Sequence, residues 1–413
     1  MNITAINLKH VLLVIGFSLF ALMACEKEDP NDPGNGGGGG GDPDPPVEGT
    51  INFDCSEELD SLVLSINPKA EDGIDYLISC ELVIHKYVSV EPGVVVAFEN
   101  DASLIVSDTA SISALGESDN WITFRGKDSA TTGWSGIHVF SKEQSNRFKY
   151  VSINGGGASD YNGNGFAANV VIYKDGRLKF EKSEIVNSFS NGIYVAGGGI
   201  MSYFSENKIS GSKGYPLVSS TNQVTNLKED NDLSGNDINA ILINSVSTLS
   251  GTHKYIDLGL DYIMDVDLLL GTDSKSGVLT LDPGVQMIMT KNNGIYVNSI
   301  SSFTINGGAN NMVNIEGEEN TAGYWKGILI NSLNSSNDFK NVRIADAGGL
   351  DFPQDSDFFD IFANVILSRD GKLTLSNVSI ENSFACGIYS DPLADLQLNN
   401  IEYKNNQKDF CEE

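Results

Sequence analysis

Five aspartates gather between Ile344 and Asn364, and calcium prefers carboxylate oxygens of this kind as ligands. They are Asp346, Asp351, Asp355, Asp357 and Asp360. Their spacing is not that of an EF-hand loop, and the matching segment between Ile153 and Asn169 offers only Asp160. A calcium site is the sharper hypothesis for this segment, and a solvated acidic loop is the simpler one.

Aromatic residues lie in the same two segments. They are Tyr161 and Phe166 in the first segment, and Phe352, Phe358 and Phe359 in the second. Exposed aromatics flanked by acids suit contact with a glycan or a protein, although such rings also pack as a loop's own small core. Trp134 and Trp325 could stack on sugars, but each belongs to a repeated strand motif, which favours packing inside the fold.

The sequence contains no assembled catalytic motif. There is no nucleophile elbow, zinc-protease helix or phosphate loop, and no pair of catalytic carboxylates can be assigned. His138 has Leu329 at its matching position, so we interpret it as a strand residue. The formal charge is −29, from 26 basic and 55 acidic residues, and such a surface repels nucleic acid.

The chain that positions these loops contains an internal repeat. The segment around Pro92 returns at Pro283, Trp134 returns at Trp325, and Phe148 returns at Phe339. Each pair is 191 residues apart (283 − 92, 325 − 134, 339 − 148). Such a constant interval predicts two tandem copies, which we place at residues 51–258 and 259–413.

Short β-rich runs such as Trp121–Phe124 and Tyr150–Ile153 alternate with Gly, Asn, Asp and Ser, and no stretch shows helical periodicity. A β-solenoid explains this pattern of short strands better than a sandwich or a propeller does. Similar sequence motifs recur at an interval of about one coil, and Asn and Gly cluster at strand ends. We expect about fifteen coils of roughly 22–24 residues, in a rod about 70 Å long. Inward ladders would include Ile137, Val171 and Ile193.

These motifs resemble the right-handed parallel β-helix proteins, pectate-lyase-like in fold, that occur among surface lipoproteins of Bacteroidetes-type bacteria. Pro92-Gly93, Ile122-x-Phe124 and Trp134-x-Gly136-Ile137 carry the resemblance. It implies an all-β, single-stranded solenoid, but the fold hosts lyases, hydrolases, adhesins and phage spikes alike. Lyases of this fold hold Ca²⁺ with carboxylates, and its hydrolases carry Asn-Thr-Asp, Asp-Asp and Gly-His-Gly signatures that this chain lacks.

The preferred hypothesis is therefore a non-catalytic, adhesin-like protein that binds an extracellular glycan or protein. The alternative is a polysaccharide lyase or glycoside hydrolase. No cofactor is expected beyond possible Ca²⁺.

The N-terminal segment has the features of a targeting signal. Residues 1–25 are predicted to form a signal peptide, and Leu22-Met23-Ala24-Cys25 resembles the lipobox in which the cysteine, here Cys25, carries the lipid. Residues 26–50, rich in Gly, Pro and Asp, predict a flexible tether. The resemblance implies a protein anchored in the outer membrane at the cell surface. A periplasm-facing or secreted protein with an ordinary signal peptide is the alternative.

Four further cysteines lie near the ends of the predicted rod. Cys55 and Cys80 are 25 residues apart, as are Cys386 and Cys411. Residues about one coil apart in sequence lie about one strand spacing apart in space, which is within disulfide reach. We predict the pairs Cys55–Cys80 and Cys386–Cys411. A metal site is the weaker alternative, because no histidine lies close to either pair in sequence.

Overall fold

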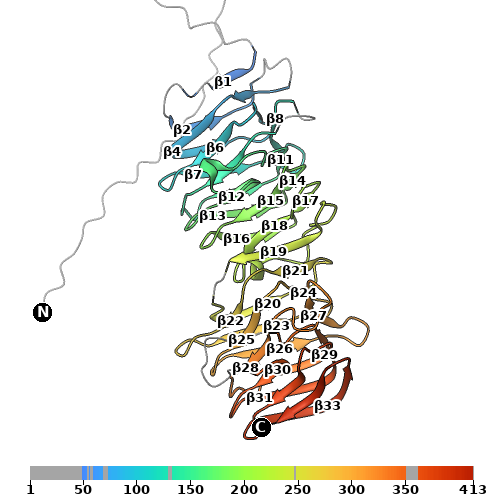
Figure 1. The fold of residues 1–413 in the computed structure, drawn as a ribbon. Coiled ribbons are helices and arrows are strands. Elements are labelled where there is room, and N and C mark those ends of the chain that lie inside the picture. The colour runs from blue at the N-terminus through green and yellow to red at the C-terminus, as the bar shows by residue number, and fades with distance from the viewer. Residues whose placement is uncertain are drawn as a thin grey trace, which may run out of the picture. The chain divides into compact units, whose positions relative to one another are not determined.

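The computed structural model describes residues 49–53, 55, 59–67, 73–128, 133–245, 248–349 and 361–412, which belong to one compact unit. The chain winds as a β-solenoid of about 13 turns (Figure 1). Every pairing between its named strands is parallel. The helical content of these residues is two single 3₁₀ turns, η1 (Tyr161–Gly163) and η2 (Val224–Asn226). The predicted all-β parallel β-helix is confirmed.

Each turn places one strand in each of three stacked columns. Column one holds β1 (Ile51–Phe53), β3 (Tyr76–Ile78), β5 (Val95–Phe98), β8 (Ile122–Gly126), β11 (Val151–Asn154), β14 (Glu184–Val186) and β17 (Lys208–Ser210). Column two starts with part of β4 (Glu81–Val90), β6 (Ser103–Val106), β9 (Gly136–Val139), β12 (Ala168–Ile172), β15 (Asn191–Val195), β18 (Leu217–Ser220) and β19 (Ala240–Ser245). It continues with β21 (Asp261–Met264), β24 (Gln286–Met289), β27 (Val313–Gly317) and the second parts of β29 (Asp338–Ala345), β31 (Lys372–Glu381) and β33 (Asp395–Lys404).

Columns three and four complete the solenoid. Column three holds β2 (Leu59–Leu64), the rest of β4, β7 (Ser111–Leu115), β10 (Arg147–Lys149), β13 (Arg177–Glu181) and β16 (Ile200–Ser205). It continues with β20 (Gly251–Tyr255), β23 (Gly277–Leu281), β26 (Ser302–Asn306) and the first parts of β29, β31 and β33. Column four holds β22 (Leu268–Leu270), β25 (Gly294–Val297), β28 (Gly327–Ile330), β30 (Ala363–Leu367), β32 (Cys386–Ser390) and β34 (Lys408–Glu412).

In the middle of the rod one column of strands ends and another begins. Column one stops at β17, with one further bridge from Lys208 to Asp232, and column four starts at the bridge between Leu249 and Leu270. Column two runs through unbroken, because β18, β19 and β21 pair in turn. In Figure 1, β8, β11, β14 and β17 run down the right side and β21, β24 and β27 follow below them, whereas β22, β25 and β28 lie on the left. Three strands per turn are thus found on both sides of the change, where one column has replaced another.

The turns vary in length more than the predicted 22–24 residues, and several are much longer, which explains why there are about 13 of them rather than fifteen. Ile241 pairs with Tyr262, so that turn takes 21 residues (262 − 241). Ile344 pairs with Ile380, so that turn takes 36 (380 − 344). The extra residues lie in loops between strands, and loop length does not alter the stacking of the strands.

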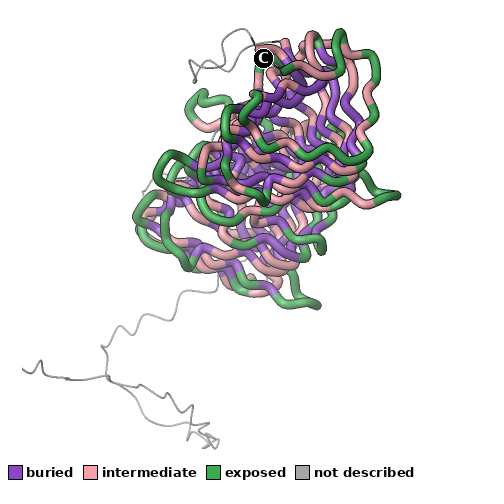
Figure 2. Tube along the Cα trace, turned by 90° about the horizontal axis from the view of Figure 1, so that it is seen from below, coloured by how far each residue is buried: buried purple, intermediate pink, exposed green. Residues whose placement is uncertain are grey.

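The core fills the inside of the coils, where Figure 2 shows the buried residues. A row of phenylalanine rings, in tilted or edge-on contact, runs through the core of the first half, with neighbouring centroids 5.3–6.4 Å apart. Trp134 and Trp325 are fully buried, and their indole N–H groups donate to the carbonyls of Asn154 and Ala345 at 2.9 and 2.7 Å. The expectation that both tryptophans pack the coil is confirmed.

One predicted ladder is wrong by one residue. Ile137 and Ile193 point inward, but the residue between them is Val170, not Val171. Val171 faces outward, where it joins a separate apolar cluster. Successive side chains of a strand point to opposite faces, so a slip of one residue reverses the direction.

Tight corners carry the left-handed residues that the sequence predicted. Among the described residues sixteen non-glycine residues have a positive φ, and twelve of them are Asn or Asp. The Asp-Gly turns at Asp175 and Asp370 follow this rule, with φ of 66° and 61° at the aspartates. Asn and Asp tolerate this region better than other residues because their short side chains hydrogen-bond locally.

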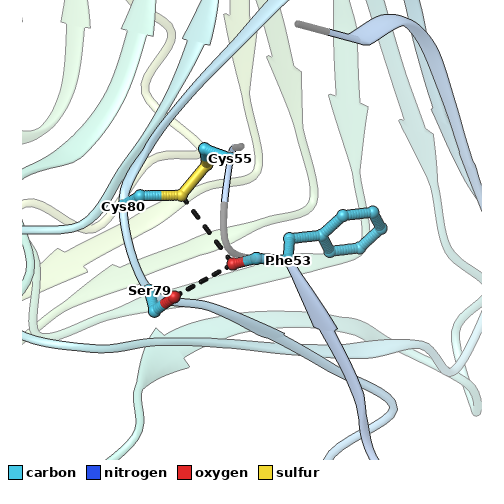
Figure 3. The surroundings of a disulfide bond; sticks show 4 residues. All are labelled: Phe53, Cys55, Ser79 and Cys80. Atoms are coloured by element: carbon cyan, nitrogen blue, oxygen red, sulfur yellow. Dashed lines mark hydrogen bonds between the residues drawn. A yellow bond between two sulfur atoms is a disulfide. The ribbon is translucent and has the colours of Figure 1, made fainter. Parts of the chain in front are cut away.

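Both predicted disulfides are present. Cys55 joins Cys80 with their Cα atoms 6.2 Å apart, and Cys386 joins Cys411 with their Cα atoms 6.0 Å apart. At the first pair, Ser79 Oγ donates to the Phe53 carbonyl at 3.0 Å, and the Cys80 sulfur lies 3.7 Å from the same oxygen (Figure 3). Each bond ties a terminal turn to its neighbour, as the spacing of the cysteines implied.

The bounds of several strands recur at the interval seen in the sequence. β6 and β25 differ by 191 at both ends, and so do β7 and β26. β7 and β26 share column three, but β6 lies in column two and β25 in column four. The tandem duplication and its boundary at residue 258 stay predictions.

Candidate functional site

The predicted loop aromatics of the first half lie on the outer face of column two. The Tyr161 ring is 5.4 Å from His138 and 5.7 Å from Phe140, measured between centroids. Phe166 stacks on Tyr194 at 4.6 Å. Both rings are half-buried and pack against the cluster around Val171. Part of their surface is therefore used within the loop, and a ligand could reach only the remainder.

A histidine without access to solvent lies beneath this loop. His138 belongs to β9, its Nδ1 is 3.2 Å from the Tyr173 hydroxyl, and its buried Nε2 has no partner among the described residues. Burial lowers the pKa of His138 to about 4, although Asp160 acts in the opposite direction. Burial likewise raises the pKa of Tyr173 to about 12. The imidazole is therefore neutral at pH 7 and is closed to an external substrate.

We expect this histidine to make the protein less stable as pH falls. Because the folded pKa lies below the usual 6.5, its contribution is complete above pH 6.5 and declines as pH falls toward 4. The loss approaches about 3 kcal/mol, at 1.36 kcal/mol per pKa unit. In urea unfolding at pH 7, 5.5 and 4, His138→Leu should lose less stability than wild type as pH falls. His253→Gln controls for removing a histidine, and an unchanged pH slope in His138→Leu would contradict the prediction.

Of the predicted metal ligands, only Asp346 lies within the described residues. It is buried at a left-handed corner with φ of 70°, and Asn382 Nδ2 donates to its Oδ1 at 2.7 Å. Burial raises its pKa. Throughout the described ranges no group of three or more His, Cys, Asp or Glu side chains could hold a metal ion. Outside these ranges lie Asp351, Asp355, Asp357, Asp360, Phe352, Phe358, Phe359 and Cys25. The calcium site stays a prediction.

A different surface combines exposed and half-buried aromatic and charged groups. It follows the corner after column three in the first half, and we name it the corner stripe. Its members are Trp121, Lys149, Tyr150, Lys182 and Glu206. The Trp121 side chain is 36% exposed, and its ring meets that of Tyr150 edge-on at 5.8 Å. Trp121 precedes the residue that pairs with Val151, so it lies one turn from Tyr150.

The backbone of the corner stripe is strained. Only four described residues with positive φ are neither Gly, Asn nor Asp, and three of these are Tyr150, Lys182 and Glu206, with φ of 50°, 49° and 55°. The fourth is the disulfide-bonded Cys55. A left-handed conformation costs an L-residue about 1–2 kcal/mol. Residues held in a strained conformation cluster at functional sites, so the strain identifies this corner as a candidate functional site.

Charged groups surround the half-buried Tyr150 ring. Lys149 Nζ is 5.4 Å and Lys182 Nζ is 6.0 Å from the centre of the Tyr150 ring, both within cation–π range. Lys182 also pairs with Glu206 at 3.4 Å. The hydrogen bond that Lys182 donates to Glu206 raises the pKa of Lys182, so this amine is a poor general base. Lys182 therefore offers the stripe a fixed positive charge.

The corner stripe leads into a groove near the change of columns. Asp230 accepts from Ser205 Oγ at 2.6 Å and from the Glu206 backbone N–H at 3.0 Å, which joins the stripe to the groove. The groove has a volume of about 460 Å³ and is lined by Thr225, Leu227, Lys228, Glu229, Asp230, Lys254 and Ile256. Both oxygens of Asp230 are engaged, so it acts as a connector and not as a free acid.

At the corresponding corner of the second half, asparagines occupy the left-handed positions, as is usual for tight corners. Asn341, Asn377 and Asn400 take the left-handed positions, with φ of 48°, 55° and 58°. They form a ladder in which Asn377 donates to Asn341 at 3.3 Å and Asn400 donates to Asn377 at 2.8 Å. Met312, 37% exposed, stands where the first half has Trp121. Asparagine satisfies the corner here, so the fold does not require Tyr, Lys and Glu in the first half.

Sequence reasoning missed the corner stripe because Trp121 and Tyr150 stand in runs that read as ordinary strands. The usable signal was a contrast between the halves. At Tyr150 and Lys182 the first half has large residues where the second half has Asn341 and Asn377. Such a contrast gains meaning only when those positions are known to be left-handed corners.

No helix in the described part of the chain is long and apolar enough to span a membrane. Comparison of the chain with protein-family models, with curated proteins and with solved structures finds no match.

Proposed function

We propose that this chain is a non-catalytic binding protein that holds an extracellular glycan along the corner stripe and the adjoining groove. The observation that carries the proposal is the strain at Tyr150, Lys182 and Glu206, three large residues at positions where the second half uses asparagine. Evolution keeps such strain where the side chains perform a task that a relaxed residue cannot.

A saccharide fits the chemistry of this surface. The exposed part of the Trp121 ring is apolar and carries negative π density, which suits the C–H face of a sugar ring, and the half-buried Tyr150 ring adjoins it edge-on. Lys149, Lys182 and Glu206 offer charged hydrogen-bonding groups beside the rings. Three turns separate Tyr150 from Asp230, or about 15 Å at the strand spacing, so the bound segment would lie lengthwise over several sugar units.

A glycan array with the purified protein tests the proposal, and binding to a defined set of oligosaccharides is the expected result. The same glycans are then incubated with the protein and assayed for reducing ends and for unsaturated products. Binding without product supports the proposal, and product formation favours the lyase or hydrolase. A protein that binds no glycan but captures a purified surface protein would replace the glycan with a protein ligand.

The proposal places this module on the cell surface through a lipid on Cys25 and the tether of residues 26–50. Changing Cys25 to serine should move the protein from the membrane fraction to the soluble fraction, because the lipid is attached through the thiol. Fractionation followed by immunoblotting measures this. A Met23→Ala variant keeps the cysteine and serves as the matched control. Equal membrane retention of Cys25→Ser would contradict the anchor, and whole-cell protease accessibility reports the face of the membrane.

A further inference from the structure

The last described turn of the solenoid, formed by β33 and β34, leaves core residues uncovered. Inward-facing Leu373 and Leu375 of β31 are almost fully buried, but their partners Leu396 and Leu398 in β33 are half-exposed and 45% exposed. Ile401, Tyr403 and Phe410, also on the core side, are half-buried. No strand of the described residues pairs with the outer edges of β33 and β34. This end therefore offers both apolar side chains and a row of backbone hydrogen-bonding groups.

The shape of this edge restricts what can cover it. β33 turns a corner at Asn400, where φ is 58°, so its ten residues form a bent edge instead of a straight one. A straight strand could pair with only one arm. A partner that covers both arms must bend at the same place, and an identical strand related by a two-fold axis through this corner does so.

The sequence of β33 is self-complementary in that arrangement. Core-side residues must face core-side residues across an antiparallel pair, and this fixes the register. Leu396 then lies opposite Tyr403, Leu398 opposite Ile401, and Asn399 opposite Asn400. On the solvent side Asp395 lies opposite Lys404, and Gln397 opposite Glu402. Every apolar residue meets an apolar one, and no like charges meet.

The third side of the end matches as well. A two-fold axis through the Asn400 corner passes across the middle of β34, which would pair antiparallel with its own copy. Lys408 then lies opposite Glu412, and Phe410 lies opposite its own counterpart. Bent shape, core-side matching and charge pairing thus all point to one occupant.

We propose that the C-terminal end of the rod, formed by β33 and β34, is a docking face for the same face of a second copy, giving a two-fold, end-to-end dimer. The paired edges continue the solenoid across the interface and cover Leu396, Leu398, Ile401, Tyr403 and Phe410. Charged residues on a sheet edge normally prevent other strands from pairing with it. In the register of this dimer, the charges on β33 and β34 instead face opposite charges.

Sedimentation of the purified protein over a range of concentrations, without any ligand, tests the dimer. Leu398→Arg should weaken self-association at least tenfold, because it places a cation in the core of the interface. Leu333→Arg is the matched control: Leu333 is 55% exposed and lies in the turn after β28, and its replacement should leave the dimer unchanged. A monomer in wild type at every concentration would overturn the proposal.

A charge swap tests the register. Asp395→Lys alone should weaken the dimer, because the introduced lysine would face Lys404 at both ends of the paired strand. Asp395→Lys combined with Lys404→Glu should restore it at least in part, since opposite charges again face each other. Circular dichroism confirms that each variant is folded. A dimer that persists equally in all variants would show that another face mediates it and would refute the docking face, and neither outcome depends on glycan binding.

Discussion

Replacing Trp121 with alanine should weaken glycan binding at least tenfold and leave the fold intact. The indole is the most exposed ring face of the corner stripe, and losing an aromatic anchor of an interface commonly costs about 2 kcal/mol, or roughly thirtyfold in affinity. Because the side chain is already 36% exposed, we expect stability to change by about 1 kcal/mol or less.

Calorimetry with an oligosaccharide identified on the array measures the affinity of this variant. Met312→Ala is the matched control, because Met312 is 37% exposed at the corresponding position of the second half. It should bind like wild type. Equal affinity in Trp121→Ala and wild type would exclude the corner stripe as the binding surface, whereas equal losses in both variants would point to a nonspecific effect.

Changing Tyr150, Lys182 and Glu206 together to asparagine should make the protein more stable and unable to bind. Asparagine tolerates the left-handed region, so each change relieves part of the cost of about 1–2 kcal/mol. The triple change also removes the exposed ion pair between Lys182 and Glu206 and the two cation–π contacts. We expect the stability lost with these contacts to be smaller than the strain relieved at the three positions together. The expected net gain is about 1–2 kcal/mol.

Denaturant unfolding gives the stability of this triple variant, and the same calorimetric titration gives its binding. The reverse exchange, Asn341→Tyr with Asn377→Lys, should destabilise the second half because it breaks an asparagine ladder without adding a ligand. Loss of stability in the first variant would refute the idea that these corners store strain. Greater stability with unchanged binding would separate the strain from the function.

The fold was predictable because its signals are local or periodic. The short β-rich runs, the burial of Trp134 and Trp325, and the clustering of Asn at tight corners were all predicted correctly. The placement of Val171 failed because strands of this solenoid are short and both faces carry apolar residues, so alternation alone does not define the inner one.

The candidate site was less predictable, because it depends on which turns become neighbours. Tyr150 reads as the start of a strand, and only the pairing of β10 and β11 with adjacent turns makes it a left-handed corner beside Lys182. Tyr161 and Phe166 had the right composition for a ligand site, but they share their ring faces with His138 and Tyr194. Composition identifies candidate groups, and the geometry of the stacked turns decides which of them remain available.

The replacement of column one by column four has a mechanical consequence. Between Asp232 and Leu249 only column two passes through as paired strands, while column three crosses by way of η2. A pull along the axis would meet one continuous ladder there and three elsewhere. We therefore expect tension to break the strand pairing first between Asp232 and Leu249, while the strands of both halves stay paired.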